Sequence, residues 1–269
     1  MINKLKYIGH YMKLFIFSVI VLLLITTILI NNTLLNEKYH INKMNNNYYN
    51  DLYNEIYESI KLNTMASGFD ERIIKTYYTK EDIKNDVLEY MDYIFNKSNK
   101  NIDLSNIETK VEDNVKNYIS ENKIKNFDES SINAYVNAVV DIYKEKITIM
   151  NIPKLLRNKL SKIHKIINIF DIVLLMIISL LLIFNRKKIK DYVYISINMI
   201  SMIYIFTSIM IIIKIDIKHL LVITYSISNY IRLLLTNITN SLLLIGIISL
   251  LLSNIINILF NVKKCKILH

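Results

Sequence analysis

Residues 14–30 read LFIFSVIVLLLITTILI, a run of seventeen positions without a charged side chain. A helix rises about 1.5 Å per residue, so this run approaches the ~20 residues that cross the ~30 Å hydrocarbon core of a bilayer. Three further apolar runs follow, at 166–184, 192–213 and 241–260. A soluble core does not need four such runs, so we predict an all-α membrane protein with four transmembrane helices.

The composition agrees with a chain divided into apolar spans and a polar part. It is 52% hydrophobic with a mean hydropathy of +0.29, yet 21% of its residues are charged. Three glycines and one proline among 269 residues favour helices over turns and sheets, and weigh against glycine-rich phosphate loops. The abundance of isoleucine, asparagine, lysine and tyrosine indicates an AT-rich genome, and we expect a low-GC Gram-positive bacterium.

The first run is expected to remain as a signal-anchor. It is longer than the apolar region of a cleaved signal peptide, about 7–15 residues, and NNTLLNEKY at 31–39 offers no small-residue cleavage pattern. Cys265 is the single cysteine, so neither an intramolecular disulfide nor a cysteine-based zinc site is expected.

Basic residues that flank the runs indicate the orientation. They are Lys4, Lys6 and Lys13, then Arg186, Lys187, Lys188 and Lys190, then Lys263, Lys264 and Lys266. With four spans these three groups share one side, which the positive-inside rule makes the cytoplasm. Residues 31–165 then lie outside and carry equal numbers of acidic and basic residues. The net charge of +10 is therefore a signature of topology, and no nucleic-acid partner is expected.

These considerations divide the chain into segments that alternate between membrane and water. In order they are a cytoplasmic basic tail (1–13), transmembrane 1 (14–30), an extracytoplasmic helical domain (31–153), a basic juxtamembrane helix continuous with span 2 (154–165), transmembrane 2 (166–184), a cytoplasmic turn (185–191), transmembrane 3 (192–213), an outer loop with an interfacial amphipathic helix (214–240), transmembrane 4 (241–260) and a cytoplasmic tail (261–269).

Two of these segments admit other interpretations. The stretch NIPKLLRNKLSKIHKIINIFD, 151–171, is basic and then apolar, so it could be a basic helix for nucleic acid, an amphipathic helix on the membrane surface or the start of a span. Pro153 suits a first helical turn and no break separates Lys165 from the apolar run, so one helix from about 154 to 185 is predicted. Residues 219–239 could form a fifth span. Arg232 and a polar stripe at helical spacing favour an amphipathic helix on the outer leaflet instead.

The outer segment is predicted to form a small bundle of four main helices and a short one at 70–77. Apolar residues recur at helical spacing, as in the stripe Ile132, Tyr135, Val136, Val139, Tyr143 and Ile147. Thr79 and Asp128 are expected to cap helices, and Ser105 with Glu108 to form a capping box. The tyrosines of these stripes fit an aromatic face for cell-wall glycan or peptide, or simple core packing, which we favour.

No constellation for catalysis, metal binding or cofactor binding is visible. The histidines His10, His40, His164, His219 and His269 are scattered and never at a metal-ligand spacing. The acidic pairs Glu81-Asp82 and Glu112-Asp113 fit the solvated faces of charged helices. We therefore expect no enzyme, no catalytic residue and no cofactor.

Polar residues within the apolar runs are the candidate functional residues, because they are costly in hydrocarbon. They are Asn168, Asp171, Asn198, Ser201, Asn254 and Asn257. They could line a pathway for an ion or small solute, or they could hold the helices together by hydrogen bonds, which we favour. Ser18 and Ser179, at comparable depth on spans 1 and 2, suggest one such bond.

Two stretches carry a resemblance to known proteins: LLNEKYHINKMNNNYYNDLYNEIYESI (34–60) and GFDERIIKTYYTKEDIKNDVLEYMDYIF (68–95). Over about 14–150 the chain resembles an uncharacterised group of Gram-positive multi-pass membrane proteins with a helical segment after the first span. This resemblance implies the topology and no catalytic residues. The order of spans is also similar to that of ABC-transporter permeases with a large outer domain, although the turn 185–191 is very short.

The sequence therefore favours a non-enzymatic protein that binds, senses or scaffolds at the cell envelope through its outer domain. The alternative is a transport or permease subunit that uses the polar residues of its spans. The expected partners are the lipid bilayer and an envelope or membrane protein. The oligomeric state stays open.

Overall fold

The computed structural model describes residues 2–95, 97–124, 128–148, 154–221 and 224–265. Helices are the only regular secondary structure in these ranges. The chain forms two compact units. We call residues 1–36, 163–220 and 232–269 the long-helix unit, and residues 37–162 and 221–231 the bundle unit.

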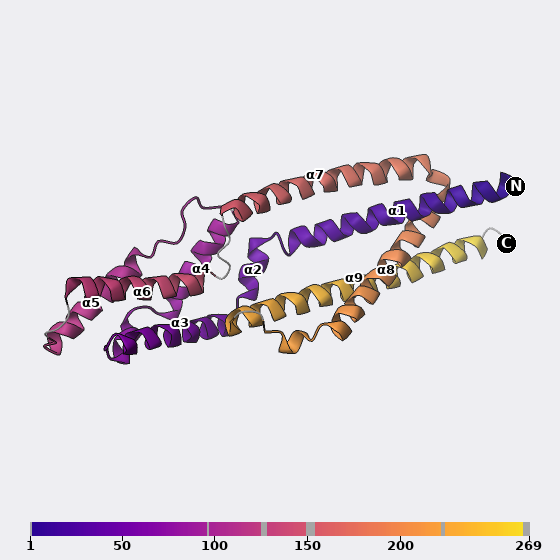
Figure 1. Cartoon of the computed structure of the whole chain (residues 1–269). Helices are drawn as coiled ribbons and strands as arrows, with labels where there is room; N and C mark the ends of the chain where they lie inside the picture. The colour runs from indigo at the N-terminus through magenta and orange to yellow at the C-terminus, as the bar shows by residue number, and fades with distance from the viewer. Residues whose placement is uncertain (1, 96, 125–127, 149–153, 222–223, 266–269) are drawn as a thin grey trace. The chain divides into compact units, whose positions relative to one another are not determined.

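Four long helices dominate the structure: α1 (Ile2–Asn32), α7 (Lys154–Phe184), α8 (Ile189–Lys214) and α9 (Tyr225–Cys265) (Figure 1). Each contains a stretch that is long and apolar enough to cross a membrane, or forms one together with residues 186–188 in the case of α8. These stretches are Ile8–Asn32, Arg157–Phe184, Arg186–Lys214 and Tyr225–Ile258. The prediction of an all-α chain with four such helices is confirmed.

Interhelical hydrogen bonds give the directions of α1 and α8. The hydroxyls of Ser18 and Ser196 lie 2.9 Å apart, as do those of Thr26 and Tyr204. Both pairs are 178 residues apart in sequence. Because the difference in residue number is the same at both contacts, α1 and α8 run parallel.

The other two long helices run antiparallel to their neighbours. Thr27 on α1 bonds Asp171 on α7, and Asn31, further along α1, bonds Asn168, which comes earlier on α7. On α8, Ser208 contacts the α9 residue Thr239, whereas Gly246, further along α9, packs beside the earlier part of α8. The starts of α1 and α8 and the ends of α7 and α9 therefore share one end of the long-helix unit, where Figure 1 shows both termini.

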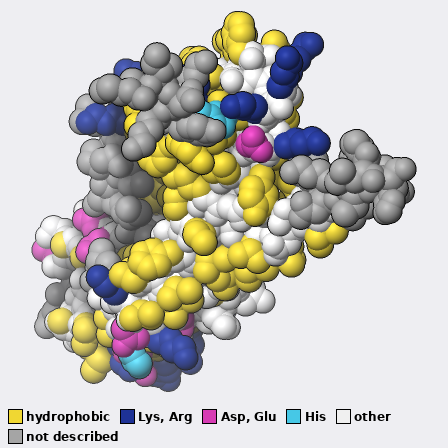
Figure 2. All heavy atoms as spheres, turned by 90° about the vertical axis from the view of Figure 1, so that its right-hand side faces the viewer, with side chains coloured by type: hydrophobic (Ala, Val, Ile, Leu, Met, Phe, Trp, Pro, Cys, Tyr) yellow, Lys and Arg dark blue, Asp and Glu magenta, His cyan; other side chains and the backbone are white. Residues whose placement is uncertain are grey.

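The long-helix unit buries few of its apolar side chains. A small cluster of Leu14, Phe17 and Tyr192 packs against Ile178 and neighbouring residues. Most other apolar side chains point outward; Phe184 is 82% exposed. In Figure 2 hydrophobic side chains cover much of the described surface that faces the viewer. An exposed apolar surface of this extent suits contact with lipid.

The bundle unit has a conventional buried core. Its helices are α2 (Glu37–Lys43), α3 (Asn46–Ala66), the short 3₁₀ helix η1 (Glu71–Thr76), α4 (Lys80–Ile94), α5 (Ser105–Glu121) and α6 (Glu129–Ile147). Every residue of the predicted stripe on α6 is buried, and Ile56, Ile83 and Val111 bring the apolar faces of α3, α4 and α5 into the same unit. The stripe tyrosines Tyr49, Tyr90, Tyr135 and Tyr143 are buried, which fits core packing, whereas Tyr53 and Tyr118 are partly exposed.

Two of the three predicted helix caps are present, and one is wrong. Thr79 and Asp82 form a capping box on α4, and Asp128 accepts a hydrogen bond from the backbone N–H of Ser131 on α6. The predicted box of Ser105 and Glu108 does not form, because Leu104 is the N-cap residue of α5. Asp103 accepts from the backbone N–H of Ser105, the group that the side chain of Glu108 would accept from in a capping box.

The helices at the membrane boundaries differ in how closely they follow the prediction. The continuous helix expected from about 154 to 185 is present as α7. A separate helix was expected within 214–240, but α9 runs without a break from Tyr225 through the fourth apolar run. Neither glycine nor proline occurs between 225 and 245, so nothing in the sequence ends the helix there.

Candidate functional site

The first turn of α9 is fastened to α3 by a carboxylate. The Oε1 atom of Glu55 accepts a hydrogen bond from the backbone N–H of Ser226, and Oε2 accepts one from its hydroxyl, both at 2.8 Å. The first N–H groups of a helix have no partner within the helix and carry a partial positive charge. Glu55 therefore satisfies the start of α9 from a residue far away in the sequence.

Two more contacts lie on the same face of α9, which residues 226, 229 and 230 share by helical spacing. The side-chain amide of Asn229 donates to Oδ2 of Asp51 at 2.7 Å. The hydroxyl of Tyr230 lies 2.5 Å from Nδ1 of His40, a buried residue of α2. The bundle unit thus holds the first two turns of α9 from both α2 and α3.

The first turn of α7 is held in a similar way by Arg157. Its guanidinium lies 4.3 Å from the centroid of the Tyr93 ring, and Nη2 donates to the backbone carbonyl of Ser98 at 2.5 Å. Arg157 is only 4% exposed, although it belongs to a basic stretch. The planar guanidinium stacks on the ring and donates at its edge, which a lysine cannot reproduce.

These contacts make the starts of two candidate spans part of the bundle unit. The bundle residues involved are Glu55, Asp51 and His40 for α9, and the partners of Arg157 for α7. Residues 154–162 of α7 and 225–231 of α9 belong to that unit, and both helices continue as apolar stretches.

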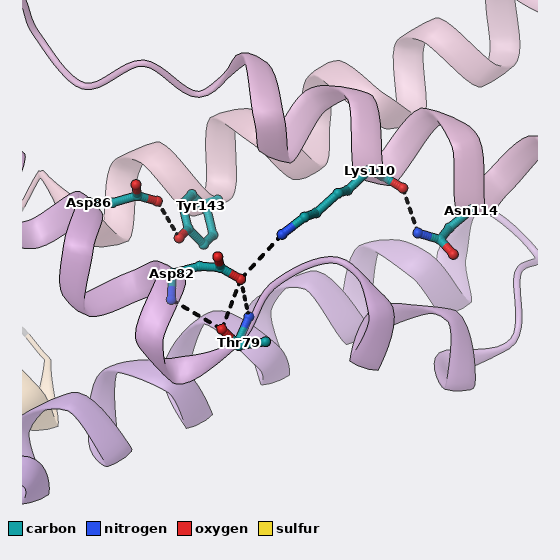
Figure 3. Close-up of polar contacts among 6 residues, drawn as sticks. All are labelled: Thr79, Asp82, Asp86, Lys110, Asn114 and Tyr143. Atoms are coloured by element: carbon teal, nitrogen blue, oxygen red, sulfur yellow. Dashed lines mark hydrogen bonds and ion pairs between the residues drawn. The ribbon is translucent and has the colours of Figure 1, made fainter.

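A polar cluster ties three helices of the bundle together (Figure 3). Lys110 of α5 donates to Asp82 of α4 at 3.4 Å, and Tyr143 of α6 donates to Asp86 of α4 at 2.6 Å. Burial raises the pKa of Asp86, and the bond from Tyr143 only partly offsets this. At Asp82 burial also opposes ionisation, but hydrogen bonds from Thr79 and the charge of Lys110 outweigh it and hold the pKa low. The cluster is explained by the packing of α4, α5 and α6.

Two of the predicted polar residues of the apolar runs make contacts between helices. Oγ1 of Thr27 donates to Oδ1 of Asp171 at 2.5 Å, and Nδ2 of Asn31 donates to Oδ1 of Asn168 at 2.6 Å. These bonds lie about one helical turn apart and fasten α1 to α7. They fit the prediction of hydrogen bonds between helices.

The other predicted residues are not brought to the same place. Asn198 donates to the carbonyl of Tyr194 in its own helix, and Ser201 is buried on α8. Asn254 and Asn257 are exposed on α9. The six residues therefore do not line a common pathway within the described residues.

Sequence reasoning missed several contacts. Ser18 bonds Ser196 on α8, whereas Ser179, its expected counterpart, donates to the carbonyl of Leu175 in its own helix. Glu55 and Asp51 were not singled out, because acidic residues on an amphipathic helix usually face solvent. Asp51 and Glu55 are four residues apart on α3, and Ser226 and Asn229 are three apart on α9, so each pair shares one helix face, but only the fold shows that the two faces meet.

Neither the cavities nor the possible metal ligands among the described residues form a further candidate functional site. Among the described residues no group of three or more His, Cys, Asp or Glu side chains could hold a metal ion. A hollow of about 340 Å³ lies between α1 and α9, and one of about 510 Å³ lies between α8 and α9. Both are open and lined mainly by aliphatic side chains, such as Ile28 and Leu244 in the first, so acyl chains suit them better than polar ligands.

No protein-family model matches the chain, and no curated protein or solved structure matches it either. Function is therefore inferred from the contacts of the chain's own residues.

Proposed function

We propose that this chain is a non-enzymatic, multi-pass plasma-membrane protein that binds or senses an envelope partner through its bundle unit. The observation that carries the proposal is the double hydrogen bond from Ser226 to Glu55. With Arg157 stacked on Tyr93, it makes the starts of α9 and α7 part of a folded binding module. A partner that shifts the bundle helices would then shift these two helices.

The proposed topology has both termini in the cytoplasm and residues 31–165 outside. Two observations support it. Three short basic groups, at 4–13, 186–190 and 263–266, fall on one side of a four-span chain, whereas the basic stretch 154–165 follows a long loop, to which the positive-inside rule applies little. The parallel register of α1 and α8 is the one expected when successive spans cross a membrane in alternating directions.

Site-specific photocrosslinking in living cells tests the binding role. Leu62 on α3 is 72% exposed and belongs to the bundle unit, whereas Phe206 on α8 is similarly exposed in an apolar span. We expect a photoreactive residue at 62 to capture one partner in a saturable manner, and one at 206 to capture lipid. If photoreactive residues at position 62 and at further exposed bundle positions capture no partner, the proposal is contradicted.

A transport subunit is the second candidate, and the bond between Thr27 and Asp171 favours it. Asp171 is the acidic residue within α7, in a stretch that is otherwise apolar. Ionisable groups within spans commonly mark ion pathways. Purified protein in vesicles would show an ion flux that Asp171→Asn abolishes and Asn198→Leu leaves intact. Equal permeability of protein-containing and empty vesicles would exclude this candidate.

A further inference from the structure

The exposed side of α9 carries a regular seam. Its positions alternate in steps of four and three, which is the repeat of a two-helix coiled coil. The seam residues are Asn240, Leu244, Ile247, Leu251, Asn254 and Ile258. All six are exposed in the structure, and Leu244 is 61% exposed. The face that packs on α8 is a different one, because it contains the buried residues Thr239, Gly246 and Ser253.

The two asparagines distinguish this seam from an ordinary lipid-facing surface. Asn254 lies within the apolar run 241–260 and Asn240 at its edge. Neither side-chain amide has a hydrogen-bond partner among the residues that the structure describes. Acyl chains offer no donor or acceptor, so an amide in hydrocarbon is costly until another polar group covers it.

We propose that a second copy of this chain covers the seam, so that two α9 helices form a parallel pair. Two copies inserted with the same topology run in the same direction across the membrane. In a parallel pair each seam residue then faces its own counterpart, so Asn254 meets Asn254 and Asn240 meets Asn240. An amide carries both donors and an acceptor and is therefore complementary to itself. Asparagine at such positions fixes the register and the number of helices.

Disulfide crosslinking of the full-length protein in its native membrane tests the pairing. The natural cysteine is first removed as Cys265→Ser, and single cysteines are then placed along 244–258. Adjacent positions 251 and 252 are matched controls, because both are exposed leucines that differ by about 100° around the helix. We expect linked dimer from Leu251→Cys and none above background from Leu252→Cys. Equal crosslinking at both positions, or none at any seam position, would overturn the proposal and leave the face to lipid.

Removal of the amides tests why the copies pair. Asn240→Leu and Asn254→Leu keep the helix apolar, and each is expected to weaken dimerisation roughly threefold to tenfold. Asn257→Leu lies off the seam and is expected to leave dimerisation unchanged. Förster transfer between labelled copies in vesicles measures the equilibrium, and circular dichroism confirms that each variant stays helical. If both seam variants dimerise as strongly as the wild type, or if Asn257→Leu has the larger effect, the asparagine pairing is wrong.

Discussion

The carboxylate of Glu55 accepts two hydrogen bonds from Ser226, one from the backbone N–H and one from the hydroxyl. The two residues are 171 positions apart in the sequence. Glu55 lies in the middle of α3, and Ser226 is the second residue of α9. The bond therefore links the middle of α3, in the bundle unit, to the start of the longest helix.

Glu55→Ala is expected to loosen the start of α9. Loss of a helix N-terminal acceptor typically costs about 1 kcal/mol, and the N–H of Ser226 would lose its partner. Hydrogen exchange on the full-length protein should become faster at 226–229 while the core of α6 keeps its protection. Glu58→Ala, an exposed acidic residue on the same helix, is the control and should leave α9 unchanged. Unchanged exchange in Glu55→Ala would show that this contact does not stabilise the helix.

Thr79 and Ser105, the two hydroxyl residues predicted to cap bundle helices, should respond differently to alanine. Thr79→Ala removes the bond to the N–H of Asp82 and should cost about 1 kcal/mol of unfolding free energy. Ser105→Ala should change the stability by only a few tenths of a kcal/mol, because its side chain makes no capping bond. Thermal unfolding of the two variants in detergent measures the difference. Equal losses would show that α5 starts as the sequence pattern predicts.

These caps illustrate what the sequence can and cannot predict. Helix positions, buried stripes and the four apolar helices follow from local periodicity, because burial of one face imposes that period. Ser105 and Glu108 match the sequence pattern of a capping box, but Asp103 accepts the Ser105 N–H that Glu108 would need, and only the backbone path decides between these two carboxylates.

Contacts between distant segments were harder to predict. Thr27 with Asp171 and Ser18 with Ser196 each need the register of two helices, which no local pattern contains. Arg157 belongs to a basic stretch of the sequence, yet it is buried against Tyr93. The amphipathic helix expected within 214–240 and the fourth apolar run are one continuous helix, α9, whose polar residue Asn229 has a partner in the bundle unit.

Asp86 makes the stability of the bundle dependent on pH. Burial raises its pKa in the folded state above the usual value of 3.8, so the folded state holds the proton more tightly. Its contribution to stability is full below pH 3.8 and is lost as the pH rises through the folded pKa. Asp86→Asn keeps an acceptor for Tyr143, so the melting temperature should rise relative to wild type between pH 4 and pH 7. Asp141→Asn, at an exposed site on α6, should show no such trend.

Gly246 permits a close approach of α9 to α8. A methyl group there would lie 2.7 Å from Cγ1 of Ile205 and 3.1 Å from its backbone nitrogen. Gly246→Ala should therefore lower the free energy of unfolding by about 1–3 kcal/mol, as other overpacking substitutions do. Gly9→Ala on α1 meets nothing within 4 Å and should be neutral or stabilising. Unfolding in detergent compares them, and equal stability would show that α8 and α9 are not tightly packed at this point.

Labelling of intact cells tests the proposed topology most directly. In a Cys265→Ser background, Glu58→Cys places a thiol on the bundle unit and Lys187→Cys places one in the turn between α7 and α8. A membrane-impermeant maleimide should label position 58 in intact cells and position 187 only after permeabilisation. Labelling of position 187 but not of position 58 in intact cells would contradict an outer bundle unit and the binding role proposed for it.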